Sequence, residues 1–177
     1  MFFFNATGQY GPFILFISSL ILLWSKYTTY FYYYCIGAAM DSILNVVLKS
    51  ILKQPRPSID ETKFNLALKH GQRFIYNKGM PYDIFGMPSG HVESCLFSTT
   101  YTFLVLNDYK ILFGYLLLST ITMIQRVYYN HHTVSQVIIG AIIGILFGYF
   151  IYYCSKSQIK GILQEKPDDN APQYLNI

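Results

Sequence analysis

Residues 86–91, Gly-Met-Pro-Ser-Gly-His, mark the point where a polar segment (residues 50–86) ends and an apolar helix begins. We place Ser89 at the N-cap of this helix, whose first backbone N–H groups have no intrahelical acceptor. Such a helix end binds anions such as phosphate, and Gly90 lets a bulky anion come close to the backbone. His91 can give a proton to whatever leaves that phosphate. The same residues also fit an ordinary capped helix whose histidine merely lies at an interface.

The composition indicates which solvent surrounds this site. Of the 177 residues, 53% are hydrophobic and 18% aromatic, whereas 12% are charged, roughly half the share typical of soluble domains. We therefore interpret the chain as a membrane protein. The net charge of +4 is small, so we expect no nucleic-acid partner. Cys35, Cys95 and Cys154 lie within or at the end of apolar stretches without metal-ligand spacing, which is typical of small buried apolar residues.

The apolar stretches predict an all-α fold, a multi-pass transmembrane bundle of about five spans. We expect a membrane-embedded domain over residues 1–154 and a polar, disordered tail over residues 155–177. The first stretch follows no basic segment and precedes no small-residue cleavage site, so we interpret it as a retained span. The spans are expected at residues 10–27, 28–49, 91–106, 110–125 and 132–154.

Polar residues recur every four positions in the second expected span: Asp41, Asn45, Lys49 and then Lys53. They occupy one side of a helix, and polar groups at membrane depth must face the interior of the bundle. Asp41 is a candidate functional carboxylate, although pairing with a lysine or arginine explains it equally well.

The long polar segment is expected to contain a helix that lies on the membrane surface. Between residues 60 and 78, Phe64, Leu68 and Ile75 recur at near-helical spacing among basic residues. These basic residues, Arg73 among them, are most simply a solvated face that meets anionic headgroups.

Small residues follow the last expected span at intervals of four, at Gly140, Gly144 and Gly148. This doubled small-xxx-small pattern indicates close helix packing. His132 and Gln136 continue the series toward the polar end, so Gln136 lies one turn below His132. There its side-chain oxygen can accept a hydrogen bond from the imidazole.

The polar ends of four spans share one membrane face if the spans alternate in direction. Three cations and two histidines then converge around the anion-binding helix end. The residues of this candidate site are Lys49, Arg56, Ser89, Gly90, His91, Arg126 and His132.

These residues reproduce, in order and spacing, the three signatures of a known family. They are Lys49 followed by six residues and then Arg56-Pro57, the run from Pro88 to His91, and Arg126 followed by five residues and then His132. The chain resembles the type 2 phosphatidic acid phosphatase (PAP2) superfamily. The resemblance implies an all-helical membrane bundle that needs no metal and no other cofactor.

The resemblance also implies a role for each signature residue. His132 would be the nucleophile that forms a phosphohistidine, and His91 the acid that protonates the leaving group. Lys49, Arg56 and Arg126, with Ser89 and Gly90, would hold the phosphate oxygens. His131 is adjacent, and only the spacing from Arg126 selects His132.

Two positions depart from the usual pattern: Gln125 where the family usually has serine, and Gln136 where it usually has aspartate. The run Arg126-Val127-Tyr128, with Gly86-Met87 before the second signature, resembles the dolichyl diphosphatase branch. We therefore expect a metal-independent phosphatase that acts on a polyprenyl (dolichyl-type) diphosphate. By resemblance, the site faces the lumen of the endoplasmic reticulum or the cell exterior, and we favour the endoplasmic reticulum.

Other functions use the same residues. The chain could be a phosphatase of phosphatidate or another phospholipid, or a catalytically silent lipid-binding membrane protein that retains a basic pocket. The vanadium haloperoxidases share the signatures but are soluble, and the expected spans argue against them. The partners expected in every case are a lipid phosphate or diphosphate and the membrane.

Overall fold

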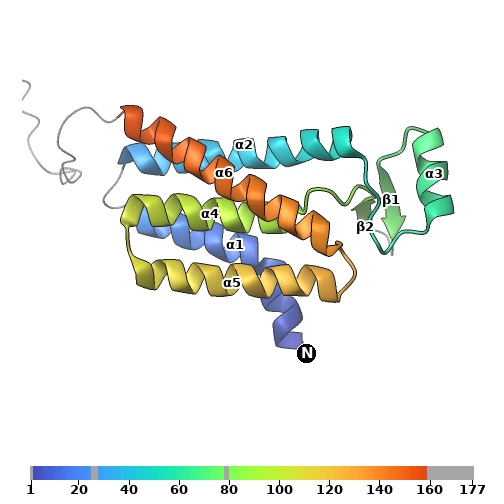
Figure 1. Ribbon diagram of the computed structural model, residues 1–177, viewed down its shortest axis with the longest axis horizontal. Coiled ribbons are helices and arrows are strands. Elements are labelled where there is room, and N and C mark those ends of the chain that lie inside the picture. Colours follow the sequence, from blue (N-terminus) through green and yellow to red (C-terminus); the bar gives the residue numbers. More distant parts are fainter. Residues whose placement is uncertain (1, 25–27, 78–79, 159–177) are drawn as a thin grey trace, which may run out of the picture.

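The described chain folds into a bundle of long helices with a small cap at one end (Figure 1). The cap consists of one short helix and two short strands, within residues 61–77 and 80–83. The computed structural model describes residues 2–24, 28–77 and 80–158. Its elements, in chain order, are α1 (Phe2–Trp24), α2 (Thr28–Leu52), α3 (Glu61–Lys69), β1 (Phe74–Asn77), β2 (Met80–Asp83), α4 (Gly90–Leu106), α5 (Tyr109–Tyr128) and α6 (Val134–Gln158). Helix α4 packs against α1, α2, α5 and α6 and is therefore the centre of the bundle.

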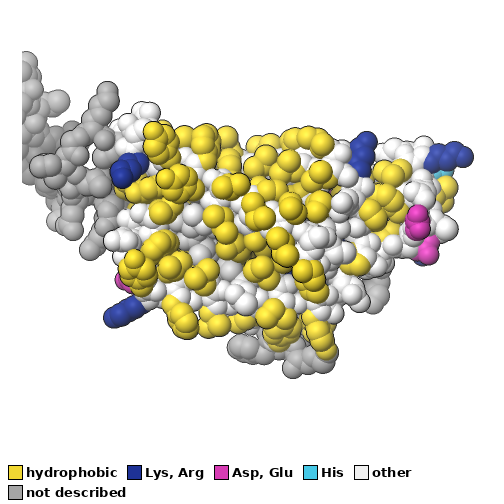
Figure 2. Space-filling view, viewed as in Figure 1, with side chains coloured by type: hydrophobic (Ala, Val, Ile, Leu, Met, Phe, Trp, Pro, Cys, Tyr) yellow, Lys and Arg dark blue, Asp and Glu magenta, His cyan; other side chains and the backbone are white. Residues whose placement is uncertain are grey.

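The predicted all-α membrane bundle is confirmed. Among the described residues, four helices are long and apolar enough to cross a membrane: α1, α2, α5 and α6. Helix α4 coincides with the expected span 91–106 but has only 17 residues. It is the central helix and carries Ser98, Thr99 and Thr102 in its buried surface. Figure 2 shows hydrophobic side chains over the bundle and charged ones near its two ends.

The close packing predicted from the glycine series occurs between α6 and α4. A Cβ atom at Gly140 would lie 2.7 Å from the Ser89 carbonyl oxygen, and one at Gly148 would lie 2.9 Å from that of Phe97. Gly144 meets the Glu93 carbonyl in the same way. Real Cβ contacts are longer than this, so the glycines allow α6 to lie directly on the backbone of α4.

The segment 60–78 contains a short helix, as expected, but the helix covers only the first half of it. Helix α3 is capped by Asp60 and ends at Lys69, and Gly71 follows with a positive φ of 65°. The chain then forms the antiparallel pair β1–β2, with Phe74 opposite Asp83. The apolar side of α3 packs on protein, because Phe64 and Ala67 form a buried cluster with Ile84 and Phe85. Aromatic and β-branched residues at 74–76 favour a strand over a longer helix.

The cap is joined to the loop that follows α2. Pro55 forms an isolated bridge with Phe85, and the Gly86 N–H donates to the Gln54 carbonyl at 2.7 Å. Arg56 is thereby fixed beside the segment that leads into α4.

Helix α6 runs to Gln158, four residues beyond the expected end of the last span. The remainder of the expected tail, residues 159–177, lies outside the described residues. In Figure 1, this end of α6 is at the opposite end of the bundle from the α5–α6 connection and the cap.

Candidate active site

The first and second signature segments meet the third at the capped end of the bundle (Figure 1). Lys49 is on the last turns of α2, Arg56 on the loop after it, Arg126 near the end of α5, and His132 just before α6. These side chains, and that of Ser89 at the start of α4, are at most 8% exposed. The structure therefore brings together groups that are far apart in the sequence.

Hydrogen bonds fix the orientation and tautomer of His132. Its Nδ1 lies 2.8 Å from the carbonyl oxygen of Gly86. A carbonyl only accepts, so Nδ1 carries the proton and donates it. Nε2 then holds the free lone pair, and Arg56 Nη1 donates to it at 3.0 Å. The attacking nitrogen of a phosphohistidine mechanism would thus be Nε2, and it faces a cation that can hold phosphate.

The surroundings of His132 keep its ring neutral. Burial lowers its pKa most, the charges of Arg56 and Arg126 lower it further, and the pKa falls to about 2. The bond to Gly86 acts in the opposite direction but is a smaller effect. The ring is therefore a free base across the physiological pH range.

Gln136 lies one turn below His132, as expected, and makes more contacts than expected. Its Oε1 is 3.3 Å from His132 Nδ1 and accepts from the Thr133 N–H at 3.2 Å, while its Nε2 donates to the Pro55 carbonyl at 2.9 Å. The Gly86 carbonyl, at 2.8 Å, is the nearer partner of the imidazole. A Cβ at Gly86 would lie 2.5 Å from Gln136 Oε1, so a larger residue here would displace the side chain of Gln136. Gln136 joins all three signature segments.

Ser89 occupies the predicted N-cap position of α4, but its side chain does not cap the helix. Its backbone N–H donates to the Gln136 carbonyl at 3.1 Å. Its Oγ is fully buried and has no hydrogen-bond partner among the described residues. A buried hydroxyl without a partner is costly, so this group is available to bind a ligand oxygen.

Gly90 has a packing role that the sequence did not predict. A Cβ at this position would lie 3.0 Å from Asn45 Oδ1, so α2 takes up the space beside it. The backbone N–H groups of Gly90 and His91 belong to the first turn of α4 and have no intrahelical acceptor. They can still face an anion.

Arg126 is buried, yet its Nε has no hydrogen-bond partner within the described parts of the chain. Its backbone carbonyl accepts from the N–H groups of both His131 and His132, at 3.0 and 3.1 Å. The end of α5 thus fixes the backbone of His132, while the Arg126 Nε is available to a ligand.

Asp83, at the end of β2, is a central residue that the sequence analysis missed. Its carboxylate pairs with Lys49 Nζ at 3.2 Å and with Arg73 Nη2 at 3.1 Å, and its carbonyl accepts from Arg56 Nε at 2.7 Å. Burial would raise the pKa of Asp83, but the bond from Arg73 and the charge of Lys49 hold it below its usual value.

Arg73 is therefore not the freely solvated residue that we expected. Besides its bonds to Asp83, its Nη1 donates to the Val46 carbonyl and to Ser50 Oγ on α2. The only feature of the sequence that could have pointed to this ion pair is that Asp83 is an acidic residue three positions before Gly86.

The other two histidines near the site, His91 and His131, have different surroundings. His91 lines a hollow with Asn45 and Ser94, on the side of α1 and α2. His131 is half-buried, and burial together with the charges of Arg126 and Arg56 lowers its pKa to about 4. Its carbonyl accepts from Arg56 Nη1 at 3.2 Å. In the part of the chain that the structure describes, no three His, Cys, Asp or Glu residues are grouped so that they could hold a metal ion.

Comparison with known proteins identifies the family of the chain. Residues 30–160, which include every signature residue, match the PAP2 superfamily. The chain belongs to the PAP2 superfamily. It is also 33% identical to a yeast (Saccharomyces cerevisiae) protein named dolichyldiphosphatase, over 140 residues that cover 73% of this chain. The alignment covers 51% of the yeast protein, so this PAP2 chain spans about half the length of that relative. No solved structure matches the chain.

Proposed function

We propose that the protein is an integral-membrane lipid phosphatase that removes the terminal phosphate from a polyprenyl (dolichyl-type) diphosphate. Membership of the PAP2 superfamily and the similarity to a protein named dolichyldiphosphatase support this reaction and substrate. The observation that carries the mechanism is the neutral His132 ring, whose Nδ1 donates to Gly86 while Nε2 faces Arg56.

In the first step, His132 Nε2 attacks the terminal phosphorus and the bond to the bridging oxygen breaks. His91, which takes up a proton together with the anionic diphosphate, gives that proton to the bridging oxygen, so that polyprenyl phosphate leaves. Arg56, Arg126 and Lys49 would offset the charge on the three equatorial oxygens. The Ser89 hydroxyl and the first N–H groups of α4 would supply hydrogen bonds.

In the second step, water attacks the phosphohistidine. Neutral His91 takes a proton from this water, and the P–N bond breaks to release inorganic phosphate and the free base of His132. Both histidines return to their starting protonation states, so the cycle needs no other reactant. By the same family resemblance, we place the protein in the endoplasmic reticulum with its site facing the lumen.

The test is phosphate release by the purified protein from polyprenyl diphosphate, polyprenyl monophosphate and phosphatidate, with His132→Ala as the inactive control. We expect turnover to be highest on the diphosphate. Highest turnover on phosphatidate would indicate a phospholipid phosphatase, and no release above His132→Ala would indicate a silent lipid-binding protein. Trapping a phosphohistidine in wild type but not in His132→Ala would identify the nucleophile.

A further inference from the structure

A groove runs from His91 between α1 and α2, with α4 as its floor. It consists of two hollows, of about 330 and 490 Å³, that share four lining residues. The shared residues are Pro12, Phe13, Ser42 and Ser94. The smaller hollow reaches Gly90 and His91, and the larger one continues to Cys35 and Phe97. The groove is therefore continuous with the candidate active site.

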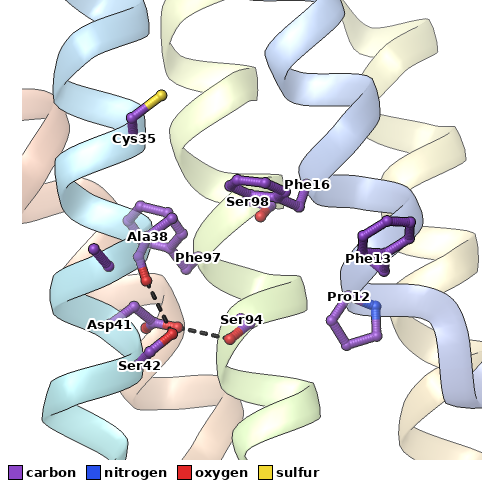
Figure 3. Close-up of a pocket in the computed structure, with 11 residues that line it drawn as sticks. Pro12, Phe13, Phe16, Cys35, Ala38, Asp41, Ser42, Ser94, Phe97 and Ser98 are labelled. Atoms are coloured by element: carbon purple, nitrogen blue, oxygen red, sulfur yellow. Dashed lines mark hydrogen bonds between the residues drawn. The ribbon is translucent and has the colours of Figure 1, made fainter.

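The character of the groove changes along its length, and Figure 3 shows its larger hollow. At the His91 end, its walls include the neutral polar side chains of Gln9 and Asn45. One turn further along α4, Ser94 donates to Asp41 at 2.8 Å. Beyond this pair, the walls are mostly apolar, with Phe16 on α1, Ala38 on α2 and Phe97 on α4. A ligand that fits has a polar group beside His91 and an apolar chain that extends away from it.

Asp41 is the one strongly polar side chain within the larger hollow. It is 1% exposed, and its pairing with a lysine or arginine, one of the two expectations, does not occur among the described residues. Its Oδ2 accepts from Ser94, while Oδ1 has no partner in the described structure. The polar section of the groove therefore ends at Asp41, about one helical turn from His91.

In-line displacement determines which groove can hold the substrate's chain. The attacking and leaving atoms lie on opposite sides of the transferred phosphorus. With His132 attacking, the leaving oxygen and the chain attached to it must lie on the side of His91. Another hollow, of about 400 Å³ between α5 and α6, is lined by Val127, Val134 and Val137. These residues are neighbours of Arg126 and His132 in the sequence, and His91 does not line that hollow.

We propose that the α1–α2 groove holds the prenyl chain of the leaving polyprenyl phosphate, and that Ala38, Cys35 and Phe97 form the wall that selects for this chain. The inference rests on the proposed function and deepens it. The polar end suits the phosphate that stays on the chain, and the aromatic and aliphatic walls suit isoprene units. The groove ends at His91, as a chain attached to the leaving oxygen requires. A bilayer lipid that merely covered the groove would not require this.

The first test narrows the groove with Ala38→Phe, matched by Ile138→Phe in the α5–α6 hollow. The measured quantity is the ratio of kcat/KM for a long-chain polyprenyl diphosphate to kcat/KM for isopentenyl diphosphate. We expect this ratio to fall at least tenfold in Ala38→Phe, because the short substrate does not reach Ala38, and to stay within about twofold in Ile138→Phe. An unchanged ratio in Ala38→Phe, or a fall confined to Ile138→Phe, would overturn the proposal.

The second test uses the native cysteines and needs no core substitution. Cys35 lines the larger hollow, Cys154 is on the distant part of α6, and Cys95 is fully buried. Saturating polyprenyl monophosphate should slow alkylation of Cys35 by N-ethylmaleimide at least fivefold and leave Cys154 unchanged, and inorganic phosphate should protect neither. Equal alkylation of Cys35 with and without the lipid would overturn the proposal, and so would equal protection by phosphatidate.

These measurements separate the inference from the proposed function. If the wild type released no phosphate from either diphosphate, the proposed function would fail, while protection of Cys35 would still support the groove. If the wild type were active but Cys35 were unprotected, only the groove assignment would fail.

Discussion

The side-chain amide of Gln136 donates to the carbonyl oxygen of Pro55 at 2.9 Å and so ties α6 to the loop that carries Arg56. An aspartate, the usual residue at this position in the family pattern, has no N–H to donate and a shorter reach. Gln136 also accepts from the Thr133 N–H and lies within reach of His132 Nδ1. The glutamine therefore adds a structural link that a carboxylate could not make.

Substitutions of Gln136 should test its two roles, the link to Pro55 and the hydrogen bond to His132. Gln136→Leu removes both, and we expect turnover of polyprenyl diphosphate to fall about tenfold, by analogy with the residues that orient metal-binding histidines. The Gly86 carbonyl still holds the imidazole, which limits the loss. Gln136→Asp should retain some activity, but less than the wild type. The measurement is turnover beside wild type and His132→Ala, and wild-type turnover in Gln136→Leu would show that Gln136 does not position the nucleophile.

Asp83→Asn should destabilise the capped end of the bundle. The substitution keeps the shape but removes the negative charge between Lys49 and Arg73, leaving two partly buried cations without a counter-ion. We expect a loss of about 1–3 kcal/mol in the free energy of unfolding, less than for a fully buried pair because Asp83 is partly exposed. Thermal unfolding in detergent measures this loss of stability.

The matched control for Asp83 is Asp108→Asn. Asp108 caps α5 through the N–H groups of Lys110 and Ile111, and asparagine caps helices about as well. An equal shift of the thermal unfolding midpoint in Asp83→Asn and Asp108→Asn would mean that the network around Asp83 contributes no specific stability.

The sequence predicted the bundle and the convergence of the signature residues because both depend on local patterns. Apolar runs of helical length mark the long helices, and alternation of spans brings Lys49, His91 and Arg126 to one end. The spacing of the glycine series likewise predicted close helix packing, although it did not identify α4 as the partner. Spacing of four residues also placed Gln136 beneath His132.

The cap could not be predicted in this way. Its chain reversal brings Asp83 to Lys49, which is 34 residues away, and no local pattern encodes that pairing. The choice between a longer helix and strands at residues 74–77 and 80–83 depended on what Phe64 and Ala67 would pack against, which is a tertiary property. The Gly86 carbonyl could not be predicted as the partner of His132 either, because every residue has a backbone carbonyl and the sequence does not single one out.

Activity should be independent of divalent metal and sensitive to vanadate. Lys49, Arg56 and Arg126 already supply positive charge around the expected phosphate position, and vanadate resembles the trigonal bipyramid of the transferring phosphoryl group. We expect full turnover in the presence of a chelator and inhibition by vanadate. Loss of turnover in chelator that magnesium restores would rule out this mechanism.

The number of membrane crossings depends on α4, the shortest helix of the bundle. If all five long helices cross, α3 and the end of α6 lie on opposite sides; if α4 does not cross, they lie on the same side. Lys63→Cys and Lys156→Cys place exposed thiols at these two positions. A membrane-impermeant maleimide added to sealed vesicles should label only one of them. Labelling of both from the same side would show that α4 does not cross.

The stability of the protein should depend on pH through His132. In the folded chain its pKa is lowered to about 2, whereas in the unfolded chain it returns to its ordinary value of 6.5. The unfolded state therefore binds a proton that the folded state does not, and stability is lost as the pH falls below 6.5. For a buried imidazole, the loss between pH 7.5 and 5.5 is about 1.4 kcal/mol. His132→Asn removes this contribution but keeps His131, so its thermal midpoint should fall less over the same range. Identical pH dependence in the two proteins would mean that His132 is protonated in the folded state near pH 6.5, which would leave Nε2 without the lone pair that the proposed attack requires.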